Sequence, residues 1–235
     1  MLPKLSLPEY TVMVPSTKEE VKFHPFLVGG EKLLLMAQAS NDSKEIVSTI
    51  KQIIKNCVPV FENRNLDEFP AFDLEYLFLK IRAKSVNNVI DLTYRDNEDQ
   101  KTYDFKVNLD EIDITYTENH TNKIQINDKV AMFMKYPSAS MTENLGNAEN
   151  ELDIYFALIR NCIDNIVDEK EIYDFKNYTK EELDEFIQSL PVSSLTQIQE
   201  FFDTAPKMEH KLLYVNSLGN NREIVLKTLT DFFFF

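Results

Sequence analysis

The chain is poor in glycine, and this shortage excludes the common phosphate-binding loops. Only four of the 235 residues are glycine, namely Gly29, Gly30, Gly146 and Gly219. Loops that bind nucleotides through their phosphates need several glycines within a few residues, because backbone N–H groups must approach the phosphate oxygens closely. Neither a dinucleotide-binding fingerprint nor a P-loop can be built from these four positions.

Cysteine and histidine are also too sparse to indicate a metal site or a nucleophile. Cys57 and Cys162 lie far apart, each in an apolar helical pattern, which predicts buried inert thiols rather than a disulfide and favours a reducing compartment. His24, His120 and His210 lie in three different segments without a His-x-x-x-His or Cys-x-x-Cys spacing. We therefore expect no metal site, no cofactor and no catalytic cysteine.

Basic residues are outnumbered, which argues against nucleic acid and membrane partners. The 25 Lys and Arg against 39 Asp and Glu give a net charge of −14. Such a charge repels phosphate backbones and anionic lipids alike. The sequence also has no apolar run of about 18 residues that would span a membrane, and its first residues do not form a signal peptide.

The acidic residues form clusters that invite a metal or glycosidase hypothesis. Clusters occur at residues 96–99, 110–113, 164–171 and 181–185. Each flanks or alternates with apolar residues, as a solvated face does, and no two carboxylates stand out as a catalytic pair. The sequence therefore predicts no enzyme and no small-molecule substrate. A cell-wall-degrading hydrolase stays as the alternative, and loss of activity on changing a single Asp or Glu would favour it.

Periodic patterns predict a mixture of helices and short strands. Two strands are expected in residues 9–27 and helices in residues 31–39, 43–57 and 72–84. Residues 89–136 alternate with period two and predict a small antiparallel β subdomain of four or five strands. The helical period returns from Asn147 to Ile166, and Thr179 with Glu182 predicts a capping box that begins a further helix. A last helix through Phe202 and two strand-like runs at 210–215 and 223–229 follow.

Together these patterns predict an α+β fold, with a helical core, an antiparallel β insert and terminal β-hairpins. Because 43% of the residues are hydrophobic, the chain can bury a sizeable core. Three segments are expected. Residues 1–86 hold the N-terminal strand pair and helices, residues 87–137 the β subdomain, and residues 138–235 a helical region ending in a hairpin and an aromatic tail.

The chain ends in four phenylalanines, and these are the main candidates for a binding site. Phe232, Phe233, Phe234 and Phe235 are costly to leave in water, so we expect them either to pack in the core or to dock into a partner. Phe23 and Phe26 form a second candidate patch. The partner-binding hypothesis therefore rests on six aromatic residues.

Several stretches of the sequence together carry a family resemblance. They are Met1–Lys4, Val21–Val28, Glu31–Ala37, Leu79–Val86, Asn122–Ser138 and Asp231–Phe233. In their order, and over nearly the whole chain, they resemble the baseplate hub subunit and hub-assembly protein family of T4-like bacteriophages.

In two places the chain departs from the family pattern. Asn87 and Asn88 stand where relatives often have glycine, and residues 94–99 lack the paired cysteines that some relatives carry in a small zinc ribbon. A metal role in that hairpin is therefore not expected, and packing and strand pairing must hold it.

The resemblance implies a function in assembly rather than in catalysis. It implies a viral tail protein that binds other hub and tail proteins of a contractile tail, as a hub subunit or as a chaperone. It also implies that the protein acts in the host bacterial cytoplasm during assembly, with the tail baseplate of the virion as its other location. A phage-encoded protein that interacts with the host is a further alternative.

Overall fold

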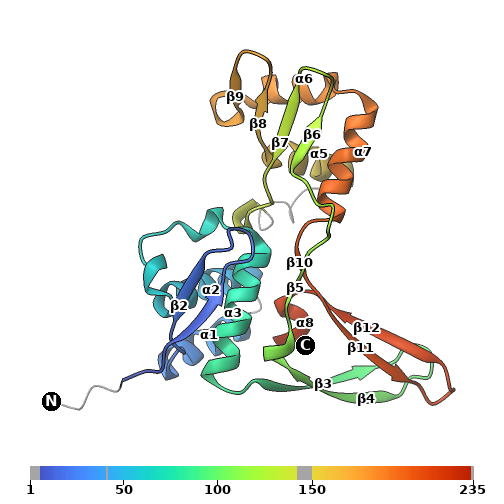
Figure 1. Ribbon diagram of the computed structural model, residues 1–235. Helices are drawn as coiled ribbons and strands as arrows, with labels where there is room; N and C mark the ends of the chain where they lie inside the picture. The colour runs from blue at the N-terminus through green and yellow to red at the C-terminus, as the bar shows by residue number, and fades with distance from the viewer. Residues whose placement is uncertain (1–5, 41, 142–149, 234–235) are drawn as a thin grey trace. The chain divides into compact units, whose positions relative to one another are not determined.

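The computed structural model describes residues 6–40, 42–141 and 150–233, and these group into two compact units (Figure 1). Unit 1 consists of residues 1–115 and 206–235, and unit 2 consists of residues 116–205. The three segments predicted from the sequence divide the chain at other places, since the boundary between residues 137 and 138 falls inside unit 2. Unit 1 is therefore discontinuous in sequence, and unit 2 is inserted into it.

Unit 1 begins with a β-hairpin, as the alternation of apolar residues predicts. β1 (Tyr10–Met13) pairs antiparallel with β2 (Glu20–Phe23), and Val12 lies opposite Val21. Both valines are buried, whereas Thr11 and Lys22 on the other face are exposed. One face of the hairpin thus contributes to the core of unit 1.

Three helices follow the hairpin. α1 (Val28–Ser40) contacts α2 (Ser43–Cys57), and α2 contacts α3 (Ala71–Ser85). The short helices η1 (Pro59–Phe61) and η2 (Leu66–Glu68) lie between α2 and α3 and bury Phe61 and Leu66. α3 is enclosed most fully, with Leu77, Leu79 and Ile81 at 0% exposure. The three predicted helices are present, although α1 begins three residues earlier than the pattern indicates.

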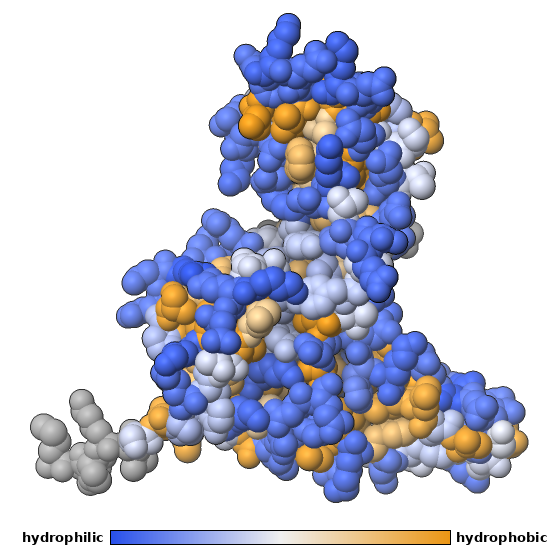
Figure 2. All heavy atoms as spheres, viewed as in Figure 1, coloured by the Kyte–Doolittle hydropathy of each residue, from blue (hydrophilic) through white to orange (hydrophobic). Residues whose placement is uncertain are grey.

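Unit 1 also contains two long hairpins. β3 (Val89–Arg95) pairs with β4 (Thr102–Asn108), and β11 (His210–Val215) pairs with β12 (Asn221–Leu226). The ring of Tyr214 lies 4.7 Å from that of Tyr103 and 5.4 Å from that of Phe105, measured between centroids. Hydrophobic atoms remain visible over β11 and β12 (Figure 2). The predicted C-terminal hairpin is confirmed, and Gly219 supplies the positive φ of 87° that its turn needs.

The last thirty residues return to unit 1 through short but specific contacts. β10 (Lys207–Met208) pairs antiparallel with β5 (Ile114–Thr115), which follows η3 (Leu109–Glu111). α8 (Leu229–Phe233) ends the described chain and buries Leu229 and Phe232. The run 223–229 was predicted as a strand, but the strand ends at Leu226 and the chain then turns into α8.

Unit 2 is a four-stranded antiparallel sheet with helices. The strand order is β6 (Lys123–Gln125), β7 (Ala131–Met134), β8 (Ile163–Val167) and β9 (Ile172–Asp174), so β9 is an edge strand. Its helices are α5 (Glu151–Cys162), η4 (Phe175–Asn177), α6 (Lys180–Ser189) and α7 (Val192–Asp203). The capping box of Thr179 and Glu182 begins α6 as predicted.

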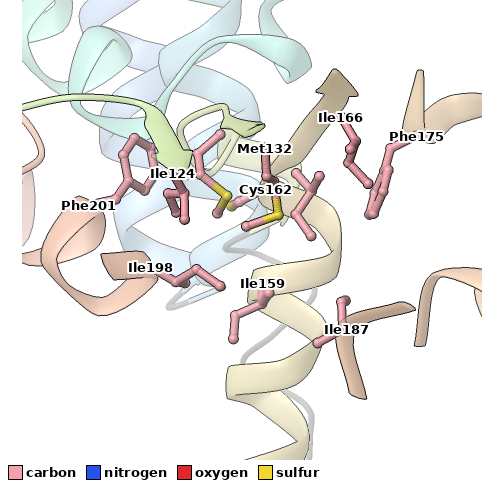
Figure 3. Packing of buried hydrophobic residues seen from close by; sticks show 11 residues of the cluster. Ile124, Met132, Ile159, Cys162, Ile166, Phe175, Ile187, Ile198 and Phe201 are labelled. Carbon is pink, nitrogen blue, oxygen red and sulfur yellow. The ribbon is translucent and has the colours of Figure 1, made fainter. Parts of the chain in front are cut away.

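The core of unit 2 lies between the sheet and its helices (Figure 3). Ile159 of α5, Ile187 of α6 and Ile198 of α7 meet strand residues that include Ile124 and Met132. All five are at most 3% exposed. A single cluster therefore holds the helices against one face of the sheet.

The structure corrects two expectations about this region. The helix predicted to run to Ile166 ends at Cys162, and Ile163, Ile166 and Val167 form β8 against β7. β-branched residues favour a strand where a neighbouring strand is available, and here tertiary pairing decides the outcome. The strands of residues 89–136 also do not form one β subdomain, because β3 and β4, β5, and β6 with β7 belong to three different sheets.

Candidate functional site

Phe23 and Phe26, predicted to bind a partner, lie in the core of unit 1. Their exposed fractions are 2% and 8%. The N–H of His24 donates to the carbonyl of Cys57 at 3.0 Å, and the N–H of Phe26 donates to Oγ of Ser85 at 3.0 Å. The segment between β2 and α1 is thereby fastened to the last residues of α2 and α3. These two rings contribute packing, and their surfaces are not available to a partner in this structure.

Gly30 allows the first turn of α1 to lie close to Phe26. A Cβ atom at Gly30 would be 3.0 Å from Cβ of Phe26, closer than real Cβ atoms normally approach. A larger residue would push α1 away from the ring. The packing of Phe26 therefore depends on the absence of a side chain at Gly30.

The C-terminal phenylalanines divide into a buried ring, a half-buried ring and two that lie outside the described residues. Phe232 is 2% exposed. The half-buried ring of Phe233 meets that of Phe78 edge to face at 5.9 Å and lies 5.8 Å from the guanidinium of Arg82. Phe234 and Phe235 are the two residues outside the description. The described part of the tail belongs to the core of unit 1.

One exposed apolar surface lies on α1 and the residue before it. Leu27, Val28, Leu35 and Met36 are 57%, 86%, 57% and 56% exposed. Val28, Leu35 and Met36 are spaced by seven and eight positions and so share one side of the helix, with Lys32 one turn after Val28. We call these four apolar residues the α1 stripe.

The α1 stripe is unusual for the outer face of a surface helix. Such a helix normally shows charged or polar residues to water, whereas α1 buries Leu34 and Ala37 on one side and keeps large apolar residues on the other. One feature of the sequence, separate from the strand and helix periodicity, predicts this exposure. Residues 33–36 are four consecutive apolar residues, and successive helical residues point about 100° apart, so they cannot all face the core.

A second exposed apolar area lies on the outer face of the β11–β12 hairpin. Leu213, Val215 and Leu218 are 73%, 59% and 63% exposed. Their neighbours across the strand pair are polar, since Leu213 lies opposite Glu223 and Val215 opposite Asn221. Polar side chains therefore interrupt this area on the facing strand, whereas on α1 the exposed Lys32 lies between Val28 and the adjacent pair Leu35 and Met36.

The acidic cluster at residues 96–99 has a structural role. In the loop between β3 and β4, Asp96 accepts hydrogen bonds from the hydroxyl of Tyr214 at 2.6 Å and from Nε of Arg222 at 3.2 Å. Glu98 and Asp99 in the same loop accept from Asn216 and Ser217 of the β11–β12 turn. The loop is therefore a clamp on the second hairpin, a long-range role that the sequence pattern does not reveal.

Two carboxylates on α3, the buried Asp73 and the half-buried Glu75, have raised pKa values, and both accept hydrogen bonds from neighbouring segments. Burial raises the pKa of Asp73 to about 6 and that of Glu75 to about 7. Asp73 accepts hydrogen bonds from the backbone N–H and the hydroxyl of Ser16, and Glu75 accepts one from the backbone of Leu229. Each carboxylate therefore fixes a neighbouring segment of unit 1.

The histidines lie in separate settings, as the sequence indicates. His120 contacts Oγ1 of Thr204 at 2.9 Å and the hydroxyl of Tyr136 at 2.8 Å, and its ring stacks on Phe201 with centroids 5.2 Å apart. Burial lowers its pKa. In the part of the chain that the structure describes, no three His, Cys, Asp or Glu side chains gather as a metal site would need. No described helix is long and apolar enough to cross a bilayer.

Comparison with known proteins decides the family. The family model described as T4 bacteriophage base plate protein matches residues 7–234, nearly the whole chain. The chain belongs to the T4 bacteriophage base plate protein family. No curated protein and no solved structure matched it. A role in the phage baseplate, in contact with other baseplate proteins, follows from membership of this family, and the α1 stripe lies within the matched residues.

Proposed function

We propose that this baseplate protein is a hub subunit or hub-assembly chaperone of a contractile tail, and that it acts through protein–protein contacts. The observation that carries the proposal is the α1 stripe. Burying a large apolar side chain against a partner contributes about 1.5–3 kcal/mol, so four such residues provide the apolar centre of an interface. The negative charge of the chain favours hub partners with basic surfaces and speeds their encounter.

The proposal is tested by making the α1 stripe polar without touching the core. Leu35→Gln with Met36→Gln changes two exposed residues, so the folded protein should keep its stability within about 0.5 kcal/mol. In phage that carry this double variant we expect hub formation to fail and the yield of infectious particles to fall at least about tenfold, the equivalent of about 1.4 kcal/mol of lost contact.

A matched control places the same changes on another exposed apolar pair. Leu152 and Val192 of unit 2 are 59% and 81% exposed. Leu152→Gln with Val192→Gln should leave the particle yield unchanged. If the α1 variant assembles hubs as well as the control does, the α1 stripe is not the interface.

The last two phenylalanines, Phe234 and Phe235, remain part of the proposal as partner-binding residues. A chain that ends at Phe233 keeps the rings that pack against α3 and removes only Phe234 and Phe235. We expect this chain to fold normally and to form hubs less efficiently. Normal hub formation would remove the end of the tail from the interface.

Quantitative mass spectrometry distinguishes the two forms of the proposal. A fixed small copy number in purified virions identifies a hub subunit that remains in the tail baseplate. Presence on hub intermediates in assembling cells, together with absence from virions, identifies a chaperone that acts in the bacterial cytoplasm and is then released.

A further inference from the structure

Unit 2 contains an apolar pocket between the β8–β9 hairpin and α6. Its volume is about 420 Å³, within the range of roughly 300–1,000 Å³ typical of ligand sites. Most of its lining is apolar or aromatic, contributed by Ile166, Tyr173, Phe175, Tyr178, Leu183 and Phe186. Hydrophobic atoms are visible at the surface over β8 and β9, with hydrophilic atoms around them (Figure 2).

The walls of the pocket are fixed by local structure. Ile166 and Tyr173 are paired across β8 and β9, and the rings of Phe175 and Phe186 meet edge to face at 5.9 Å. The capping box at Thr179 sets the start of α6, which brings Leu183 and Phe186, three positions apart, to the same side of that helix. The pocket is therefore formed before any ligand arrives.

Two carboxylates, Asp168 and Glu182, also line the pocket. Asp168 accepts the N–H groups of Lys170 and Glu171, both at 2.8 Å, and Glu182 accepts the N–H of Thr179 at 2.8 Å. Hydrogen bonds from these backbone groups lower the pKa of both carboxyls. Both side chains are thus negatively charged at neutral pH.

The charge of the whole chain is concentrated in unit 2. Residues 116–205 contain 17 Asp and Glu against 7 Lys and Arg, a net charge of −10 out of the total of −14. Glu169 and Glu181, each next in sequence to a lining carboxylate, are exposed, as is Glu171, and Glu169 forms an ion pair with Lys129 at 3.3 Å. An apolar pocket in such a field selects for a positively charged ligand and against an acidic one.

We propose that this pocket docks a basic segment of a partner protein. One aromatic or branched aliphatic side chain of that segment fills the pocket, and lysine or arginine on either side of it faces Asp168 and Glu182. The edge strand β9 lies beside the pocket and offers backbone groups along which an extended segment can lie. The site is on unit 2 and is independent of the α1 stripe, so failure of either proposal leaves the other standing.

A set of short peptides tests the proposal on the full-length chain. The probe is Ala-Lys-Ala-Phe-Ala-Lys-Ala with both ends blocked, and its binding is followed through the backbone amide NMR signals of the isotope-labelled protein. We expect saturable shifts at β9 and α6 with a Kd on the order of 1 mM, as suits a single anchoring side chain. Two matched peptides replace Phe with Ala or both Lys with Glu, and each should bind at least about tenfold more weakly.

Variants of the protein test whether the peptide binds at this pocket. Tyr178 is 40% exposed and lines the pocket, whereas Tyr116 is 46% exposed and does not. Tyr178→Ala should lower the affinity for the probe at least about tenfold, and Tyr116→Ala should leave that affinity unchanged. Glu171→Lys with Glu181→Lys should also lower the affinity for the probe. Added salt should reduce the difference in affinity between that variant and the wild type.

Three results would overturn the proposal. The first is the absence of saturable shifts at β9 and α6 with the Lys-containing probe. The second is equal affinity for the Lys and Glu peptides, which would show that charge does not select the ligand. The third is concentration-dependent shifts at the same residues without peptide, which would make the pocket a contact between two copies of the chain.

Discussion

The carboxylate of Glu75 on α3 accepts a hydrogen bond from the backbone N–H of Leu229, the first residue of α8. This bond joins the C-terminal tail to the most buried helix of unit 1. Burial, with a smaller contribution from the negative charge of Asp231, raises the pKa of Glu75 to about 7. The hydrogen bond from Leu229 itself favours the ionised carboxylate, but burial outweighs it, so the group that fastens the tail is difficult to ionise.

Glu75→Gln should stabilise the protein at high pH. Glu75 has an ordinary pKa of 4.5 and a folded pKa of about 7, so the folded state binds more protons between these values. Its contribution to stability is fully present below the lower value and is lost as the pH rises through the upper one. We expect Glu75→Gln to raise the free energy of unfolding by on the order of 1–3 kcal/mol at about pH 8, and by much less at about pH 5.

Urea unfolding at the two pH values measures this difference. Asp73, whose pKa is raised to about 6, is unchanged in both proteins, so the comparison isolates Glu75. Glu62→Gln, at an exposed position, should have little effect at either pH. An equal change from Glu75→Gln at both pH values would contradict the assignment.

Phe232→Ala should be the most damaging single change in the tail. The ring is 2% exposed, and removing a buried phenylalanine side chain costs about 3–5 kcal/mol through lost transfer energy and the cavity left behind. Phe233→Ala removes a half-buried ring and its contact with Phe78, and should cost on the order of 1 kcal/mol. Chemical unfolding of both variants gives the comparison, and the reverse order would show that Phe232 is not the anchor.

Asp96→Asn should loosen the two long hairpins of unit 1 from each other. Hydrogen bonds from Tyr214 and a neighbouring backbone N–H, together with Arg222, lower the pKa of Asp96. Its contribution to stability is therefore present above its ordinary pKa of 3.8 and is lost as the pH falls through the lower folded value. We expect faster amide hydrogen exchange in β11 and β12 of the variant at neutral pH. Asp104→Asn, an exposed change on β4, serves as the control, and equal exchange in both would refute the clamp.

Thr179→Ala should destabilise unit 2 and distort the pocket beside α6. The variant loses the hydroxyl that accepts the N–H of Glu182 and donates to its carboxylate, a cost of about 0.5–2 kcal/mol. Ser193→Ala in the first turn of α7 replaces an exposed hydroxyl that does not cap its helix. Thermal unfolding should separate the two variants, and similar midpoints would show that the capping box contributes little.

Features governed by neighbours in sequence could be predicted from the sequence. The N-terminal hairpin, α2, α3 and the capping box of α6 follow from alternation, helical spacing and cap residues within a few positions of each other. The predictions of a mixed α+β class and of the baseplate family were also confirmed. In these cases local preference and the final fold favour the same structure.

Features governed by distant contacts could not be predicted in the same way. The pairing of Thr115 with Lys207, the clamp of Asp96 on Tyr214 and the strand at Ile163 depend on segments brought together by folding. The same reason explains the candidate site. Phe23 and Phe26 were predicted to bind a partner, but folding buries both rings, whereas Leu35 and Met36 are exposed.

The insertion of unit 2 into unit 1 reverses the usual order in which a growing chain completes its domains. Domains generally fold during synthesis from the N-terminal end. Here every strand of the unit 2 sheet leaves the ribosome before residues 206–235, which supply the partner of β5, the hairpin held by Asp96 and the ring of Phe232. The unit that begins the chain is thus the last to be finished, and premature termination near the end of translation would release an intact unit 2 joined to an open unit 1.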